Sequence, residues 1–82
     1  MGTTHRSKLE QQIEMLRLLK TEDRTQTALC YGSNMNQSKG ADLIVELAEK
    51  GLMAWNEDRR KFWLTPVGNS AIRAYDKLRR LI

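Results

Sequence analysis

The stretch that decides the fold lies between residues 27 and 68 and consists of three segments. The first is Thr27-Ala-Leu-Cys-Tyr-Gly-Ser-Asn-Met-Asn36, the second is Leu43-Ile-Val-Glu-Leu-Ala-Glu-Lys-Gly-Leu-Met53, and the third is Lys61-Phe-Trp-Leu-Thr-Pro-Val-Gly68. Their apolar spacing and turn residues predict a short helix, a tight turn, a longer helix and a β-hairpin. The chain therefore centres on a helix pair that is followed directly by a hairpin.

The short helix is predicted over about residues 28 to 33, with Thr27 as its N-cap. Gly32 and Asn34 suit the positive backbone angles at the end of a helix. Asn36 is then expected to cap the longer helix, because an Asn side chain accepts a hydrogen bond from the first helical turn.

The longer helix is expected to end at about Lys50, with Gly51 just beyond its last residue. Helical spacing gives it one inward stripe, formed by Gly40, Leu43, Ile44, Leu47 and Ala48. The opposite side carries polar and charged residues, so it is expected to face outward.

The hairpin is predicted from residues 52–56 and 61–65, which have strand composition and flank a charged turn. If the strands pair about Arg59, Trp55 faces Trp63 across the ladder and the two indoles share one partly exposed face. Such a pair suits packing against a terminal segment, a dimer surface, or a platform on which single-stranded nucleic acid stacks.

The first helix is expected over about residues 8 to 20, capped by Ser7. Its core face is predicted to be Leu9, Ile13, Leu16 and Leu19. Met15 and Leu18 fall elsewhere on the helical wheel, which suggests a second contact with the last helix or with another subunit.

The last helix is expected over residues 66–82, where Thr65 is the cap and Pro66 occupies the first turn. Its apolar stripe is predicted to be Val67, Ala71, Ala74, Tyr75, Leu78, Leu81 and Ile82. A chain this short has little core in which to bury such a stripe. The helix is therefore a candidate dimerisation element.

The element order predicts an α+β, mostly helical fold: a winged helix-turn-helix with a wing of two or three strands and a C-terminal helix. A very short third strand is expected near residues 24–26. We expect residues 1–82 to form a single domain whose residues 1–6 are disordered. In this fold the second helix of the pair lies in a DNA groove.

Composition favours binding over catalysis. The net charge is +4, which favours an anionic partner. His5 and Cys30 are the only residues of their types, so no metal site, cofactor site or nucleophile–base pair is expected, and the chain is predicted not to be an enzyme. Nothing suggests a membrane span, a signal peptide or a small-molecule ligand, so a cytoplasmic location is expected.

Double-stranded DNA is the predicted partner. The outer face of the longer helix is expected to read bases, and the basic hairpin tip is expected to contact the phosphate backbone. Asp42 and Glu46 argue against this, because they would repel phosphates. The alternative is that the outer face of this helix is an ordinary solvated surface. The candidate DNA-contacting residues are Gln37, Ser38, Lys39, Ala41, Asp42, Arg59, Arg60, Lys61, Arg24 and Lys8.

A homodimer is also expected, because the last helix and the first helix present more apolar residues than one small core accommodates. The candidate interface residues are Met15, Leu18, Tyr75, Leu78 and Ile82. The alternative function is a protein-interaction module that uses the face shared by Trp55 and Trp63 together with the last helix.

The segment from Thr27 to Gly68 resembles a family of small archaeal winged-helix DNA-binding proteins. Its members carry Thr-x-Ile-x-Tyr-x-x-Asn-Leu-Ser, then Leu-x-x-Lys-Gly-Leu-Ile, then Leu-Thr-x-x-Gly. The matching residues are Thr27, Leu29, Tyr31, Asn34, Met35 and Asn36, then Leu47, Lys50, Gly51, Leu52 and Met53, then Leu64, Thr65 and Gly68. The resemblance implies DNA binding, and several relatives form dimers through a C-terminal helix.

Overall fold

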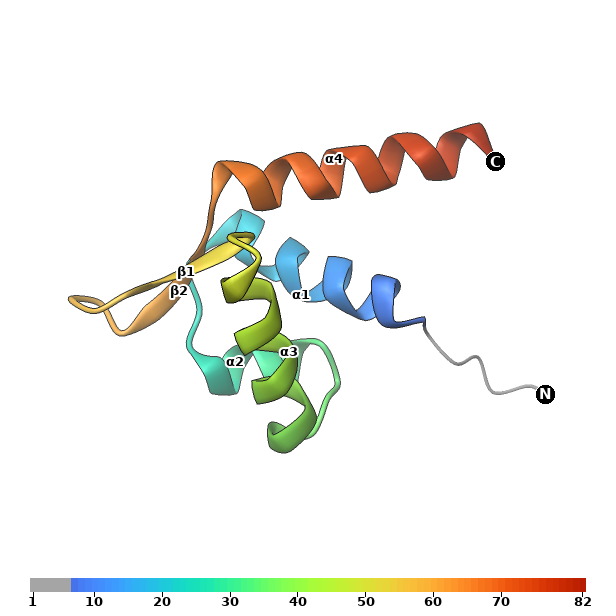
Figure 1. Ribbon diagram of the computed structural model, residues 1–82. Helices are drawn as coiled ribbons and strands as arrows, with labels where there is room; N and C mark the ends of the chain where they lie inside the picture. Colours follow the sequence, from blue (N-terminus) through green and yellow to red (C-terminus); the bar gives the residue numbers. More distant parts are fainter. Residues whose placement is uncertain (1–6) are drawn as a thin grey trace.

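The computed structural model describes residues 7–82 as four helices and one two-stranded antiparallel hairpin (Figure 1). The elements are α1 Lys8–Thr21, α2 Gln26–Gly32, α3 Gln37–Glu49, β1 Met53–Asn56, β2 Lys61–Leu64 and α4 Pro66–Leu81. The predicted element order and the α+β class are confirmed. The expected disorder of residues 1–6, and His5 with it, lie outside the described residues.

Three of the predicted helix caps are confirmed. Ser7 forms a capping box at α1, because its side chain accepts from the Glu10 N–H at 3.1 Å and its own N–H donates to Glu10 Oε1 at 3.0 Å. The Asn36 side chain accepts from the Lys39 N–H at 2.8 Å at the start of α3. Thr65 does the same for Gly68 at 3.0 Å at the start of α4.

The predicted start of α2 is wrong by two residues. Thr25, not Thr27, is its N-cap, and its hydroxyl accepts from the Ala28 N–H at 3.1 Å. Both threonines are able to cap, and Thr25 is placed to do so by backbone pairing of the preceding residue with β2. Asn34 has the expected positive φ of 59°, whereas Gly32 lies inside α2.

The core lies where α1, α2 and α3 meet the hairpin and the start of α4. Its buried members are Met15, Leu16, Leu19, Leu29, Cys30, Leu43, Ile44, Leu47, Met53 and Ile72. Two predictions for α1 are wrong, since Met15 is fully buried and Leu9 is 51% exposed. α1 contacts both α2 and α4, so it buries a wider arc than one stripe, and Leu9 lies in its first turn, away from the hairpin (Figure 1).

α2 and α3 pack closely at Gly40. A Cβ built at this position would overlap the Cys30 Sγ and lie 3.1 Å from the Cys30 Cβ. Gly40 therefore lowers the helix propensity of α3 but allows the two helices to approach each other. The buried stripe predicted for α3 is confirmed for Gly40, Leu43, Ile44 and Leu47.

The predicted hairpin register is wrong by one residue. The observed pairs are Met53–Leu64, Ala54–Trp63, Trp55–Phe62 and Asn56–Lys61. The turn spans four residues and places Arg60 in the left-handed region at φ 56°, with its N–H donating to the Asn56 carbonyl at 2.7 Å. As a result, the two indoles lie on opposite faces of the ladder, because directly paired residues share a face.

The predicted third strand is reduced to one bridge. Arg24 pairs with Phe62 on the free side of β2 through two backbone hydrogen bonds of 3.1 and 2.7 Å. The chain between α1 and α2 is thereby tied to the hairpin.

α4 runs antiparallel to α1 along one side of the molecule (Figure 1). Its first turn is set by Gly68, where a Cβ would overlap the Leu52 carbonyl oxygen, and by Thr65, whose hydroxyl donates to the Gly51 carbonyl at 2.6 Å. These contacts join the Gly51-Leu52 pair before the hairpin to the Leu-Thr-x-x-Gly motif after it, which explains why the two motifs occur together.

The predicted apolar stripe of α4 needs correction. Ile72 is its fully buried side chain, and Asp76 is half-buried because it forms an ion pair with Arg17 of α1. Most of the predicted stripe faces solvent: Val67, Ala74, Leu78, Leu81 and Ile82 are exposed. Among residues 7–82 no helix is long and apolar enough to cross a lipid bilayer.

Candidate nucleic-acid interface

The outer face of α3 is open to solvent. Gln37, Ser38, Lys39 and Asp42 are exposed and Ala41 is half-buried, on the side of the helix opposite its buried stripe. The first three form the first turn, where backbone N–H groups make a helix N-terminus attractive to phosphate. The five predicted residues of α3 thus lie together on one accessible surface.

One acidic residue of α3 is paired with cations of the same chain. Glu46 accepts from Lys8 at 3.1 Å and from Lys50 and Gln12 at 3.4 Å each. The hydrogen bond from the Lys8 ammonium is the main reason that the pKa of Glu46 lies below its usual value. The negative charge of Glu46 is therefore partly compensated by Lys8 and Lys50 before any DNA approaches.

Asp42 differs from Glu46. It lies one turn earlier on the same helix, is exposed, and has no ion pair or hydrogen-bond partner among residues 7–82. Its carboxylate remains available to accept from a base amino group, as cytosine N4 offers in the major groove.

Lys8 and Arg24, the two predicted backbone-contacting residues outside α3 and the wing, have different surroundings. Lys8 is 67% exposed and lies beside α3, in a shallow hollow shared with Lys39 and Asp42, but its ammonium is bound to Glu46. The Arg24 side chain is held within the protein. Its guanidinium donates to the Leu18 carbonyl at 2.7 Å, so it satisfies the end of α1.

Further contacts keep Arg24 within the protein. It donates to Thr21 Oγ1 at 3.3 Å and lies 3.6 Å from Glu22, and its side chain is only 27% exposed. These contacts stabilise the fold, and the role of Arg24 as a backbone clamp stays a prediction.

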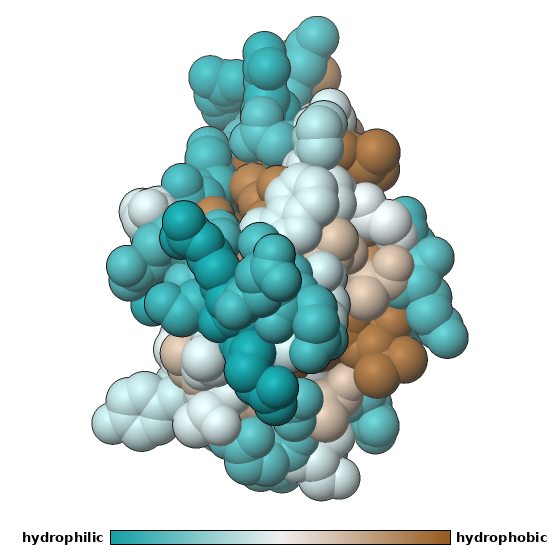
Figure 2. Space-filling model, turned by 90° about the vertical axis from the view of Figure 1, so that its left-hand side faces the viewer, coloured by the Kyte–Doolittle hydropathy of each residue, from teal (hydrophilic) through white to brown (hydrophobic). Residues whose placement is uncertain are grey.

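The wing tip carries the expected exposed cations. Arg59, Arg60 and Lys61 are all exposed at the end of the projecting hairpin (Figure 1). Arg60 is 77% exposed and forms a long ion pair with Glu57 at 3.9 Å, a contact that contributes little in water. Figure 2 faces this side of the molecule, and the centre of the surface is strongly hydrophilic.

The predicted dimer residues divide into two groups. Met15 is fully buried in the core and is thus unavailable to another subunit, which corrects its assignment. Leu18 is half-buried and packs against Gly32, while Tyr75 lies under Arg79 at 5.9 Å. The exposed candidates are at the far end of α4, where Leu78 is 52% and Ile82 96% exposed.

Two exposed residues, one of α2 and one of α3, lie outside the set of predicted DNA-contacting residues. Tyr31 of α2 is 88% exposed, and Val45 of α3 is 56% exposed. Tyr31 directly follows the buried Cys30, so helical spacing alone turns it outward, a signal present in the sequence. Val45 offers a methyl surface of the kind that contacts thymine methyl groups.

Two helices joined by a tight turn, with the second helix exposed and a basic hairpin after it, define a winged helix. The chain belongs to the winged helix-turn-helix family, whose model matches residues 5–82. No curated protein matches the chain significantly. The fold and the family together indicate DNA binding.

Proposed function

We propose that this protein binds double-stranded DNA with α3 in the major groove and the wing on the phosphate backbone, as a transcriptional regulator or a chromatin-associated protein. The observation that supports this best is the outer face of α3, which is polar at its N-terminal turn and open to solvent. The basic wing tip supplies phosphate contacts. The motif resemblance to small archaeal DNA-binding proteins supports the same function.

The chemistry of α3 fits base reading. Gln37 suits adenine, Lys39 suits guanine, and Asp42 suits the amino group of cytosine. The first turn also offers backbone N–H groups to a phosphate. The objection that α3 is acidic is weakened, because Lys8 and Lys50 already bind Glu46.

We further infer that two copies pair through α4. Val67, Ala71, Ala74, Leu78 and Leu81 alternate in steps of four and three residues, the spacing of a helix–helix seam. Four of these five are exposed in the single chain. A symmetric pair would cover the seam and present two α3 helices to one duplex, about one helical turn or a multiple apart.

The proposed mechanism is binding without catalysis, and it requires no cofactor. The cytoplasm is the proposed location, because a DNA-binding protein acts where DNA is and because the lone Cys30 thiol suits a reducing compartment. The protein-interaction alternative uses the Trp55/Trp63 face together with the last helix. The observed register places the two indoles on opposite faces, so they do not form one shared surface, whereas the exposed apolar residues of α4 stay open to such a partner.

The test is a fluorescence anisotropy titration with a random-sequence duplex at several salt concentrations. The wild-type protein should bind with an affinity that falls steeply as salt rises, because phosphate contacts release counterions. Replacing Arg59, Arg60 and Lys61 by alanine should weaken binding to every duplex and lower the salt slope by about 0.9 per lost phosphate contact.

The matched control is Arg73→Ala, which removes one exposed cation of α4 outside the proposed interface. Absence of binding at low salt would overturn the proposed function. An unchanged slope in a folded wing variant would remove the wing from the interface.

A further inference from the structure

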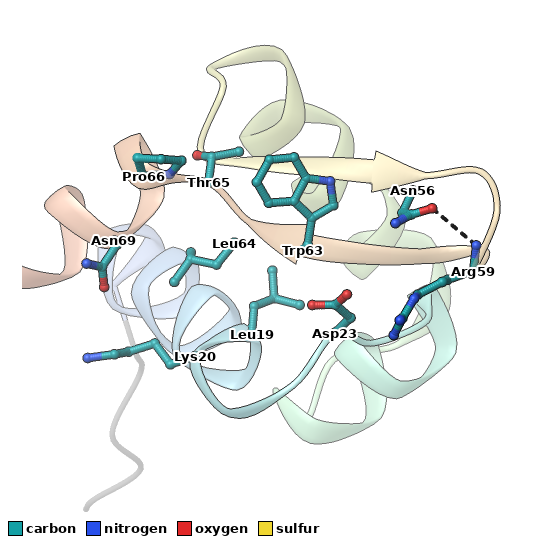
Figure 3. A pocket seen from close by; sticks show the side chains of 10 residues that line it. All are labelled: Leu19, Lys20, Asp23, Asn56, Arg59, Trp63, Leu64, Thr65, Pro66 and Asn69. Carbon is teal, nitrogen blue, oxygen red and sulfur yellow. Dashed lines mark hydrogen bonds between the residues drawn. The ribbon is translucent and has the colours of Figure 1, made fainter.

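An open groove runs along the hairpin on the side of the α1 end and the α4 start. Figure 3 shows Trp63 at its middle, with Arg59 at the turn and Pro66 and Asn69 at the other end. Its lining residues are Leu19, Lys20, Asp23, Asn56, Arg59, Trp63, Leu64, Thr65, Pro66 and Asn69. None of the duplex contacts proposed for α3 lies in this groove, so it is a separate surface that only Arg59 shares.

The two indoles have different surroundings. Trp55 is paired with Phe62, whose ring lies edge-on at 4.9 Å between centroids, and its Nε1–H donates to Glu57 at 2.9 Å. Trp63 is paired with Ala54, a side chain too small to cover an indole. Trp63 is 37% exposed, and its Nε1–H has no hydrogen-bond partner among residues 7–82. Trp55 is slightly more exposed, at 42%, so the two indoles differ in their neighbours and not in their exposure, and of the two only Trp63 lines the groove.

The groove around Trp63 is polar and has a net positive charge. Arg59 and Lys20 contribute two cations against the single carboxylate of Asp23. Asn56 and Asn69 add amide groups, a type of group able to hydrogen-bond to base edges, although Asn56 Oδ1 already accepts from the Arg59 N–H at 3.2 Å. An aromatic face flanked by cations and amides is the arrangement that binds single-stranded nucleic acid, because bases stack on the ring and phosphates meet the cations.

We propose that this groove binds single-stranded DNA or RNA, with one unpaired base stacked on Trp63 and neighbouring phosphates at Arg59 and Lys20. This activity goes beyond the proposed duplex binding and does not depend on it. The polar lining favours a nucleic acid over a second copy of the chain, whose uncovered apolar surface lies on α4.

The two tryptophans make a direct test available, since the chain has no others. In the Trp55→Phe protein all indole emission comes from Trp63, and in the Trp63→Phe protein it comes from Trp55. Each protein is titrated with a short oligo-dT and, separately, with an oligo-U of the same length. The proposal predicts strong quenching in the Trp55→Phe protein and little change in the Trp63→Phe protein.

Affinity measurements extend the test. Trp63→Ala should weaken binding of oligo-dT by about 5- to 150-fold, the loss expected for one stacked base. Lys20→Ala should weaken it as well, while duplex affinity stays unchanged, because neither residue belongs to the proposed duplex surface. Lys77→Ala, an exposed cation on α4, is the matched control and should leave both affinities unchanged.

The two oligonucleotides distinguish DNA from RNA as the ligand. Tighter binding of oligo-dT assigns the groove to DNA, and tighter binding of oligo-U assigns it to RNA. Quenching of Trp55 instead of Trp63 would overturn the proposal, as would failure of the wild-type protein to bind either oligonucleotide at low salt. Neither result would affect duplex binding by α3, so the two proposals fail independently.

Discussion

α3 and α4 are both amphipathic helices, but they differ in how much of their apolar surface is buried within the chain. α3 buries Gly40, Leu43, Ile44 and Leu47 within the chain and exposes a mostly polar face on which Val45 is the large apolar side chain. α4 buries only Gly68 and Ile72 and exposes leucines and a valine. The exposed surface of α3 therefore suits a nucleic acid, whereas that of α4 suits a protein, and it is on α4 that partner-dependent stability is expected.

The comparison predicts a large loss of stability at the buried side of α3. Gly40→Ala places a methyl group against the Cys30 Sγ, so we expect a loss of about 1–3 kcal/mol in the free energy of unfolding. This loss would exceed the gain of roughly 1 kcal/mol in helix propensity. Denaturant unfolding measures the difference.

The matched control for Gly40 is the double variant Cys30→Ala with Gly40→Ala. Removing the sulfur relieves the overlap, so the double variant should lose less stability than the two single changes added together. Simple additivity would show that close packing at Gly40 is not what limits the stability of α3.

At the exposed side of α4 we expect an effect on assembly and not on folding. Leu78→Glu should raise the dissociation constant of the dimer by about 30-fold or more, because it places a carboxylate in an apolar contact. Leu78 is 52% exposed in the single chain, so the monomer should stay folded. Sedimentation equilibrium measures the mass and circular dichroism checks the fold.

Ile72→Glu is the contrasting variant on the same helix. Ile72 is fully buried, so a carboxylate there should unfold the chain and not merely split the dimer. A wild-type mass of about 9.5 kDa at high micromolar concentration would contradict the dimer. α4 would then be only a cover for its own chain.

The smallest effect is expected where α4 is tied to α1. The hydrogen bond from Arg17 lowers the pKa of Asp76, so their pair stabilises the fold above the unfolded pKa of about 3.9. That contribution is lost as the pH falls through the lower folded-state pKa. Asp76→Asn should therefore reduce Tm slightly at pH 7, and the difference from wild type should vanish in acid.

A constant Tm difference across this pH range would mean that the ion pair between Arg17 and Asp76 does not stabilise the contact of α4 with α1. The pair is about 40% exposed on each side, so the effect at neutral pH should be modest.

The sequence predicted the elements whose signals are local. Each of the three caps Ser7, Asn36 and Thr65 lies at the helix start where it was predicted. Such caps are predictable because they depend on one side chain and the three residues after it. Gly51 ends α3 at φ 77°, as its lack of a side chain permits.

The errors come from features that depend on tertiary contacts. The observed hairpin register differs from the predicted one by one residue, because Arg60, and not a Gly or Asn, takes the left-handed position of the turn. Met15 is buried because α1 is covered on two sides, which one-stripe periodicity does not reveal. The hydrogen bond from Arg24 to a carbonyl six residues earlier was likewise not visible in the sequence.

The candidate site on α3 was predicted from the sequence because an outward face follows directly from the inward one. The charge balance of this site was not predicted. The partners of Glu46 come from α1 as well as α3, so the compensation of this carboxylate appears only in the folded chain.

The central claim is that the exposed face of α3 reads DNA, and one measurement tests it most directly. Affinities of the wild-type, Lys39→Ala and Arg79→Ala proteins are measured on one panel of duplexes that differ in sequence. Lys39→Ala should reorder the panel, with losses of about 5- to 150-fold on the preferred duplexes, whereas Arg79→Ala should leave the order unchanged. If both variants preserve the wild-type order, Lys39 does not read bases and the account of α3 is contradicted.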